Sequence, residues 1–225
     1  MQSIIAFWKD FKLLPSAWLL LVQLCSLFLY LITSQSRSFQ ILTWSIGVLA
    51  LLIIAKVIRQ TPAYTIMGLF FVSGALICSF MMLVGYSSTT LQIITHTFEA
   101  LAYFCAAYGL VRYMFEDRYL TKDELFAAGS VFTLIAWGFA FLYSICQLLV
   151  PNSFLNPNHI GSYQTWLDLL FLSFSLQSAT GLSDLTPLAP GARVVAMLQM
   201  FGGVMYLALI VSRLIALHYI AHKND

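Results

Sequence analysis

The sequence predicts an all-α membrane protein with six transmembrane helices and a short re-entrant helix between the fifth and the sixth. Three observations lead to this fold class: the scarcity of charge, the long apolar runs, and the placement of lysine and arginine. Hydrophobic residues make up 60% of the 225 residues and charged residues only 9%, whereas a soluble domain carries about 25% charge. Much of the surface must therefore face lipid, and the length suits one domain.

Long apolar runs define the expected spans, because a helix needs roughly 20 apolar residues to cross about 30 Å of hydrocarbon. The runs of suitable length are 17–33, 41–58, 64–85, 95–114, 126–150 and 193–218. Segment 166–178 is also apolar but is too short to cross, so we expect a re-entrant helix, protected by protein or water. Residues 1–15 mix apolar residues with Lys9, Asp10 and Lys12, which predicts an amphipathic helix at the membrane surface.

The basic residues provide an independent test of six spans. With the N-terminus in the cytoplasm, the opposite side of the membrane holds only Arg37 and Arg193. The cytoplasmic side then holds Lys9, Lys12, Lys56, Arg59, Arg112, Arg118, Lys122, Arg213 and Lys223. This asymmetry follows the positive-inside rule. We expect a multi-pass protein of the cell (inner) membrane with both termini in the cytoplasm.

Several function classes are not expected. The sequence has no basic block that indicates nucleic-acid binding. No set of acids, histidines and nucleophiles gathers at one membrane depth, so we do not expect an enzyme, a cofactor or a structural metal site. A secondary transporter would favour two related halves with broken helices, and no such internal repeat is evident.

The most informative segment lies between the fifth and sixth expected spans. Residues 171–187 read F-L-S-F-S-L-Q-S-A-T-G-L-S-D-L-T-P. This resembles the pore loop of bacterial potassium channels, which reads like Y-F-S-F-x-T-L-T-T-V-G-Y-G-D-I-T-P. Without a gap, the identical positions are Ser173, Phe174, Gly181, Asp184, Thr186 and Pro187. The resemblance continues upstream and into the sixth span, and covers roughly the C-terminal half of the chain.

The resemblance implies a homotetramer in a lipid bilayer, because one pore loop per chain requires four chains to close a filter. Rings of backbone carbonyls would then replace the hydration shell of a monovalent cation, K⁺ and/or Na⁺. The implied selectivity filter consists of Ser178, Ala179, Thr180, Gly181, Leu182, Ser183 and Asp184. Segment 166–178 would be the pore helix, with Thr165 and Asp168 spaced as a capping box. Asp184 would either concentrate cations at the outer mouth or cap the turn before Thr186.

Three filter positions depart from the family pattern. Ala179 lacks a threonine hydroxyl, Leu182 lacks a tyrosine hydroxyl, and Ser183 replaces the second glycine. A non-glycine residue at positive φ costs about 1–2 kcal/mol, so we expect a wider or more flexible filter with reduced potassium selectivity. A compensating arrangement would instead preserve selection of potassium. Two different functions also fit an altered filter: a non-selective membrane-permeabilising effector and a non-conducting regulatory channel subunit.

The expected domains follow from these assignments: an amphipathic helix at 1–15, four transmembrane helices within 16–124, and a pore domain at 125–225. The fourth span contains Glu99, near His96, but lacks the arginine repeat of voltage sensors. In the sixth span, Gly202 and Gly203 either form a hinge or allow close helix packing. Towards its end, Leu209, Ile210 and Leu214 either form an apolar gate or face lipid.

Overall fold

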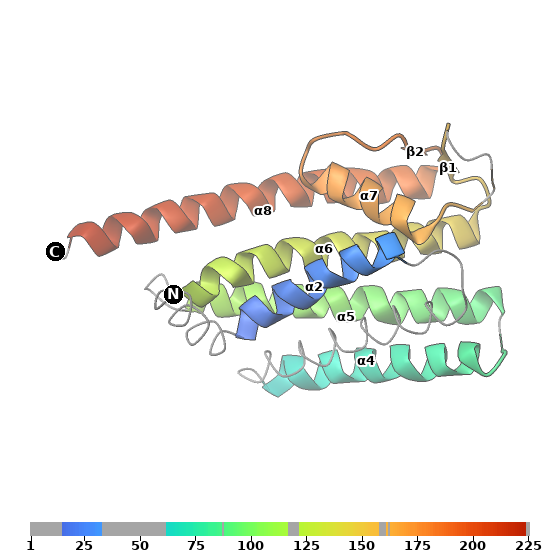
Figure 1. Ribbon diagram of the computed structural model, residues 1–225, viewed down its shortest axis with the longest axis horizontal. Coiled ribbons are helices and arrows are strands. Elements are labelled where there is room, and N and C mark those ends of the chain that lie inside the picture. The colour runs from blue at the N-terminus through green and yellow to red at the C-terminus, as the bar shows by residue number, and fades with distance from the viewer. Residues whose placement is uncertain are drawn as a thin grey trace.

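The computed structural model describes residues 15–32, 62–86, 88–116, 122–157, 161 and 163–223 (Figure 1). These residues form helices α2 (Pro15–Ile32), α4 (Pro62–Leu83), α5 (Thr89–Glu116), α6 (Lys122–Leu149), α7 (Trp166–Gln177) and α8 (Pro190–Lys223), and strands β1 (Phe154–Leu155) and β2 (Thr186–Pro187). The described architecture is helical, as the sequence predicts. The expected span 41–58 and all but the last residue of the expected N-terminal helix 1–15 lie outside the described residues.

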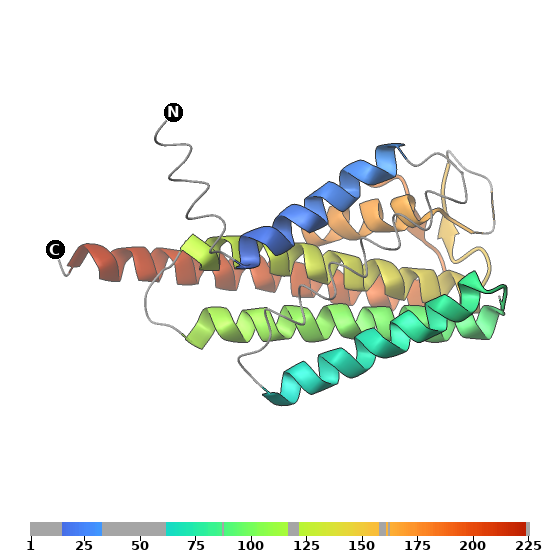
Figure 2. The ribbon, with the colours of Figure 1, turned by 60° about the horizontal axis from the view of Figure 1, so that its bottom comes forward.

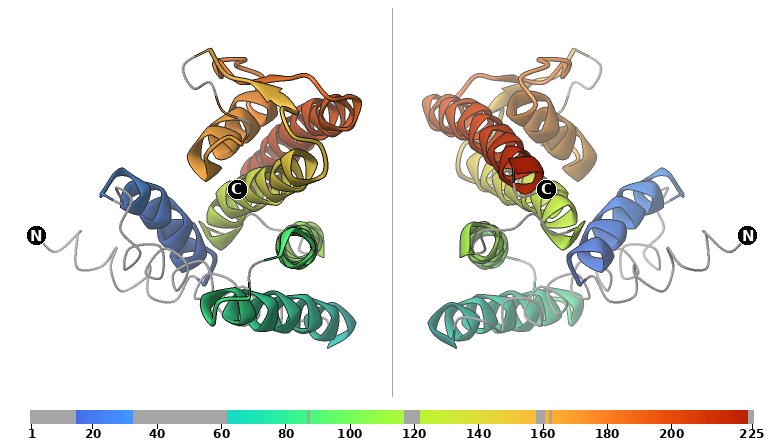
Figure 3. Two further views of the ribbon diagram at one scale, coloured as in Figure 1. Left: turned by 90° about the vertical axis from the view of Figure 1, so that its right-hand side faces the viewer. Right: turned by 90° about the vertical axis from the view of Figure 1, so that its left-hand side faces the viewer.

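Helix α6 is the centre of the bundle. It packs against α2, α5, α7 and α8, and α4 packs on α5 (Figures 1 and 3). Helices α2, α4 and α6 run in one direction along the bundle, and α5 and α8 run in the other (Figure 1). Short α7 lies beside the first half of α8, at the end where α8 begins (Figures 1 and 2).

Two described helices are long and apolar enough to cross a membrane: Asp123–Leu149 and Pro190–Arg213. They correspond to the expected spans 126–150 and 193–218. Helix α7 has 12 residues, which at 1.5 Å per residue is about 18 Å and less than the hydrocarbon thickness. The fold is therefore that of a helical membrane protein with one short helix between its two longest apolar helices.

Polar caps move two helix starts away from the apolar boundaries. Helix α5 begins at Thr89 instead of residue 95, because the Ser88 hydroxyl accepts a hydrogen bond from the Leu91 amide at 3.1 Å. Helix α6 begins at Lys122 instead of residue 126, with two acids in its first turn, where the helix dipole favours negative charge. An apolar run marks the part of a helix that enters lipid, and the capped helix extends beyond it.

A pair of two-residue strands was not predicted. Strands β1 and β2 pair antiparallel, with Phe154 opposite Pro187 and Leu155 opposite Thr186. The backbone before a proline prefers an extended conformation, which suits Thr186 to a strand. The Ser153 carbonyl accepts the Leu188 amide at 2.8 Å and extends the attachment. This pair ties the chain leaving α6 to the chain entering α8.

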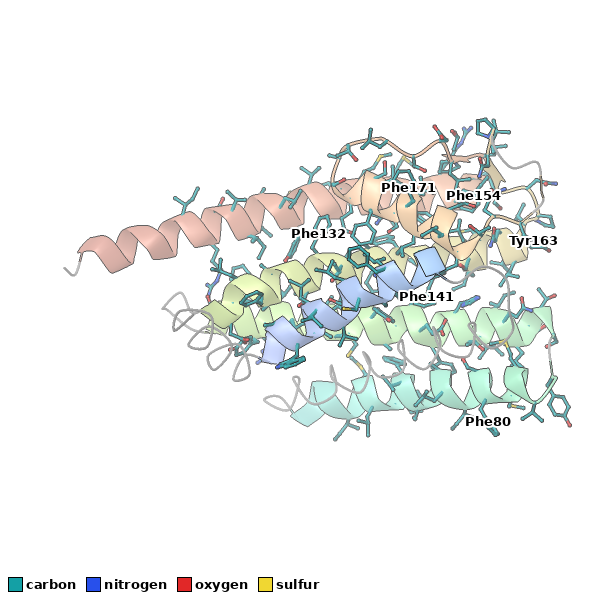
Figure 4. All side chains as sticks on the ribbon, viewed as in Figure 1. Phe80, Phe132, Phe141, Phe154, Tyr163 and Phe171 are labelled. Carbon is teal, nitrogen blue, oxygen red and sulfur yellow. The ribbon has the colours of Figure 1, made fainter. Side chains whose placement is uncertain are left out.

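The helix surfaces that point away from the bundle are apolar. Large exposed side chains include Phe70 and Phe80 on α4 and Phe201 and Ile215 on α8, and Phe80 projects from α4 in Figure 4. Soluble monomers rarely expose large apolar patches, and many large apolar side chains of the described helices are exposed. Such a surface is suited to contact with lipid or with neighbouring protein.

A buried carboxylate joins the starts of α2 and α6. Asp123 accepts hydrogen bonds from the Ser16 amide at 3.2 Å, the Ser16 hydroxyl at 2.9 Å and the Tyr113 hydroxyl at 3.3 Å. The first amides of a helix have no partner within the helix, and a carboxylate there also interacts favourably with the helix dipole. Asp123 therefore fixes the first turn of α2 against α6.

We predict that Asp123→Ala destabilises the protein by about 1–3 kcal/mol, because it leaves buried donors at Ser16 without their acceptor. The measurement is the thermal unfolding midpoint of the detergent-solubilised protein. Tyr113→Phe is the matched control and should lower the midpoint less, since it removes only the longest of the three bonds. Equal midpoints for wild type and Asp123→Ala would contradict this role.

Candidate functional site

Helix α7 begins at a complete capping box. The Thr165 hydroxyl accepts the Asp168 amide at 3.2 Å, and the Asp168 carboxylate accepts the Thr165 amide at 3.2 Å and its hydroxyl at 2.7 Å. These reciprocal bonds satisfy free donors of the first turn. The structure confirms both the capping box and, within one residue, the expected helix 166–178.

Buried polar side chains then hold α7 against α6. The Ser173 hydroxyl donates to the Ala136 carbonyl at 2.6 Å, and the Gln177 amide group donates to the Phe132 carbonyl at 2.7 Å. Phe132 lies between α6 and α8 in Figure 4, and its ring centroid is 6.1 Å from that of Phe174. Helix α7 is therefore fixed in position by its first turn and its last turn.

The chain after α7, residues 178–184, is called the filter loop here, and it folds back onto Ser175. The Ser175 carbonyl accepts the main-chain amides of Thr180 at 3.1 Å and Gly181 at 3.3 Å. The Ser175 hydroxyl accepts the amide of Ser183 at 3.1 Å. Ser175 is buried, so three amides of the loop point towards the protein interior.

The direction of these amides sets the direction of the carbonyls. The described residues contain no cis peptide bond, and a trans peptide directs the carbonyl of one residue opposite to the amide of the next. Because the amides of residues 180, 181 and 183 point to Ser175, the carbonyls of Ala179, Thr180 and Leu182 point away from α7. These three residues are exposed. The loop therefore presents carbonyl oxygens on its open side, next to the electronegative end of α7.

The left-handed positions differ from the expectation. Ala179 has φ of 56° and Gly181 has φ of 64°, whereas Ser183 is not among the residues with positive φ. The prediction that Ser183 has a strained backbone with positive φ is wrong. The strain lies at Ala179, where a left-handed conformation costs about 1–2 kcal/mol. The loop turns sharply at Ala179 because α7 ends there, whereas Ser183 is held by the hydrogen bond of its amide.

The side chains of the filter loop divide between anchors and exposed groups. The hydroxyls of Ser178 and Thr180 lie 3.0 Å apart, and the Ser183 hydroxyl accepts the Leu185 amide at 3.2 Å. Leu185 is buried and ends the loop in a second apolar cluster. Asp184 lies at an exposed bend, and Leu182 is 70% exposed. The loop is thus attached on both sides while its tip faces outwards.

Helix α8 passes the end of α7 as one continuous helix. A Cβ atom at Gly203 would lie 2.6 Å from the Gln177 carbonyl oxygen, whereas one at Gly202 would have nothing within 4 Å. Of the two interpretations, the geometry at Gly203 favours close packing. Further along, Leu209 is 53% exposed but Ile210 is only 7% exposed and lies in the main apolar core. The side chain of Leu214 lies outside the described part.

Ionisable side chains occur near both ends of the bundle. Towards the start of α5, His96 Nδ1 lies 2.9 Å from Glu99 Oε2, so Glu99 finds its partner on its own helix. At the other end, Arg213 of α8 lies 3.8 Å from buried Glu124 of α6 and donates to the Met114 carbonyl of α5. These contacts hold the second half of α8 against the α5–α6 junction.

Sequence reasoning did not identify Ser175, Gln177 or Gln199 as site residues, yet all are buried around the filter loop. The available signal was the presence of polar side chains within apolar segments, which is costly in a membrane and usually has a purpose. Ser175 binds amides of the loop that follows it, whereas Gln177 and Gln199 bind groups on other helices. No sequence spacing identifies these partners.

We predict that Gly203→Ala destabilises the protein by about 1–3 kcal/mol, because the new methyl group meets main-chain atoms of α7. The matched control is Gly202→Ala, which should be neutral or stabilising by up to about 1 kcal/mol through helix propensity. Thermal unfolding midpoints in detergent measure both. A Gly203→Ala midpoint at or above that of Gly202→Ala would argue against close packing.

Comparison with known proteins gives one family match. Residues 130–218 match the model of a family described as ion channel. The matched range begins in α6 and includes α7, the filter loop and most of α8, which are the elements that build the site. No curated protein and no solved structure shows a significant match to this chain. Residues 130–218 are thus similar to the ion channel family, which supports an ion channel embedded in a membrane.

Proposed function

We propose that this chain is one subunit of a homotetrameric cation channel with a potassium-channel-like pore and reduced potassium selectivity. The observation that carries the proposal is the outward direction of the carbonyls of Ala179, Thr180 and Leu182, fixed by three amides on Ser175. Carbonyl oxygens are the ligands that replace the hydration shell of a monovalent cation in a filter. The C-terminal end of α7 adds a favourable field for a cation.

Several copies are proposed because one loop presents its carbonyls on one side only, and the number four is taken from the resemblance to potassium channels. An ion in a filter needs oxygen ligands all around it, so copies must meet about an axis. The exposed apolar side chains of α8, including Phe201, suit contact with neighbouring copies and with lipid. Asp184, at the exposed outer end of the loop, would then form a ring of negative charge at the pore entrance.

Reduced selectivity is proposed from the side chains of the filter loop. Leu182 is exposed and carries no hydroxyl that could bind α7. Ala179 adopts a left-handed conformation without a side-chain ligand of its own. The loop is held mainly by Ser175, and a filter with fewer attachments should discriminate less sharply between K⁺ and Na⁺.

We propose that the chain crosses the cell (inner) membrane six times. Both termini then lie in the cytoplasm. Helix α2 runs towards one end of the bundle and α4 begins at the other (Figure 1), which is the geometry that a further span at 41–58 requires. The filter loop runs from the end of α7 to β2, beside the first half of α8 (Figure 1). Arg213 belongs to the second half of α8, so we propose an outer filter and a basic cytoplasmic end. A gate near that end would use exposed Leu209, since Ile210 is occupied in packing.

Reconstituted liposomes test the function. Purified protein should pass K⁺ and Na⁺ while it retains an entrapped dye, and native mass spectrometry should give a tetramer. Dye leakage would indicate a membrane-permeabilising effector instead, and the absence of flux would indicate a non-conducting subunit. A monomer would contradict the tetrameric pore.

We predict that combining Ala179→Thr, Leu182→Tyr and Ser183→Gly raises the K⁺/Na⁺ permeability ratio by about tenfold, or about 1.4 kcal/mol of differential binding. The hydroxyls added at positions 179 and 182 supply a ligand and a bond to α7, and the change at position 183 completes the filter pattern of the family. Reversal potentials in a planar bilayer measure the ratio. Leu167→Tyr, an exposed site on α7 away from the loop, is the control. An unchanged ratio in a conducting triple variant would contradict the proposed register.

A further inference from the structure

Four fully buried polar side chains from three helices meet behind the filter loop. They are Tyr143 of α6, Ser173 and Gln177 of α7, and Gln199 of α8, and each is 0% exposed. The Gln199 amide nitrogen lies 3.0 Å from the Ser173 carbonyl, 2.6 Å from the Ser173 hydroxyl and 3.2 Å from Gln177 Oε1. The Tyr143 hydroxyl donates to Gln199 Oε1 at 2.7 Å. Gln199 is therefore the residue through which all the others connect.

The donors and acceptors of this network are determined by main-chain atoms. A carbonyl only accepts, so the group of Gln199 facing Ser173 must be its NH₂. The NH₂ of Gln177 donates to the Phe132 carbonyl, which leaves Gln177 Oε1 as an acceptor for Gln199. Each amide group has one orientation that satisfies its neighbours, and the network has a single arrangement.

The surroundings make this arrangement costly to break. A buried acceptor that loses its donor carries its full desolvation penalty, and lipid offers no replacement. An apolar side chain at position 199 would leave the Ser173 carbonyl and Gln177 Oε1 without this donor. Helix α7 would then keep its hydrogen bonds to α6 but lose those that join it to α8 through Gln199.

The network controls the same turn of α7 that holds the filter loop. Ser173 and Gln177 lie on either side of Ser175, which accepts the three amides of the loop. Gly203, one helical turn beyond Gln199, brings α8 against the Gln177 carbonyl. A displacement of this turn would carry the loop carbonyls with it.

We propose that Gln199 is a positioning residue that sets the width of the cation path, by fixing the last turn of α7 between α6 and α8. The inference rests on the proposed channel function. Through Gln199, helix α8 would influence the position of the filter loop by way of α7. The Gln199 side chain is buried and would not itself bind the cation.

The test compares the permeability of methylammonium, a large monovalent cation, with that of potassium. Gln199→Met keeps the side-chain length and removes the amide, and the methylammonium/potassium ratio should rise by about threefold to tenfold. Met200→Leu, at the exposed neighbouring position of α8, is the matched control and should leave the ratio unchanged. Permeability ratios come from reversal potentials, which do not depend on the number of channels.

Tyr143→Phe provides a milder variant that removes one hydroxyl. Its ratio should rise less than that of Gln199→Met, and adding it to Gln199→Met should have no further effect, because the shared partner is already gone. An additive effect on the ratio would overturn the inference.

The remaining outcomes separate the two claims. A wild type that carries no cation current overturns the proposed function. A conducting wild type with unchanged ratios in Gln199→Met and Tyr143→Phe overturns only the inference. If both variants lose the folded tetramer while Met200→Leu retains it, the network serves folding alone and the inference is overturned as well.

Discussion

The amides of Thr180, Gly181 and Ser183 converge on Ser175, and the chemistry of the site depends on this convergence. A loop that leaves a buried helix must satisfy its amides, because an unpaired buried donor is costly. Here one serine accepts three of them, through its carbonyl and its hydroxyl. Planar trans peptides then turn the matching carbonyls outwards. The open face of the loop is lined with carbonyl oxygens because the amides are hydrogen-bonded on the opposite side.

This arrangement works only if α7 itself is fixed, and the fold achieves this at both ends of the helix. The capping box of Thr165 and Asp168 closes the first turn. Buried side chains of Ser173 and Gln177 attach the later turns to main-chain carbonyls of α6, while the β1–β2 pair joins the segments that flank the site. A helix too short to span lipid is thereby attached to α6 along one face, and the proposed re-entrant position requires such protection.

The sequence was most informative where short-range chemistry decides the structure. Apolar run length located α6 and α8 closely, and the spacing of Thr165 and Asp168 identified the start of α7. It failed where a residue's role depends on a distant partner. A serine within an apolar helix gives no sign that it will accept three amides, and Gln199 meets partners on two other helices. Ala179 adopts the left-handed backbone conformation. The anchoring of the loop determines this conformation more than the residue type does.

The most direct measurement is an electron cryo-microscopy structure of the full chain in lipid nanodiscs containing potassium. The account predicts four copies whose carbonyls at Ala179, Thr180 and Leu182 face one axis, with cation density between them. It also predicts that the amides of residues 180, 181 and 183 remain on Ser175 in each copy. Loops that stand apart from a common axis, or carbonyls turned towards α7, would contradict it.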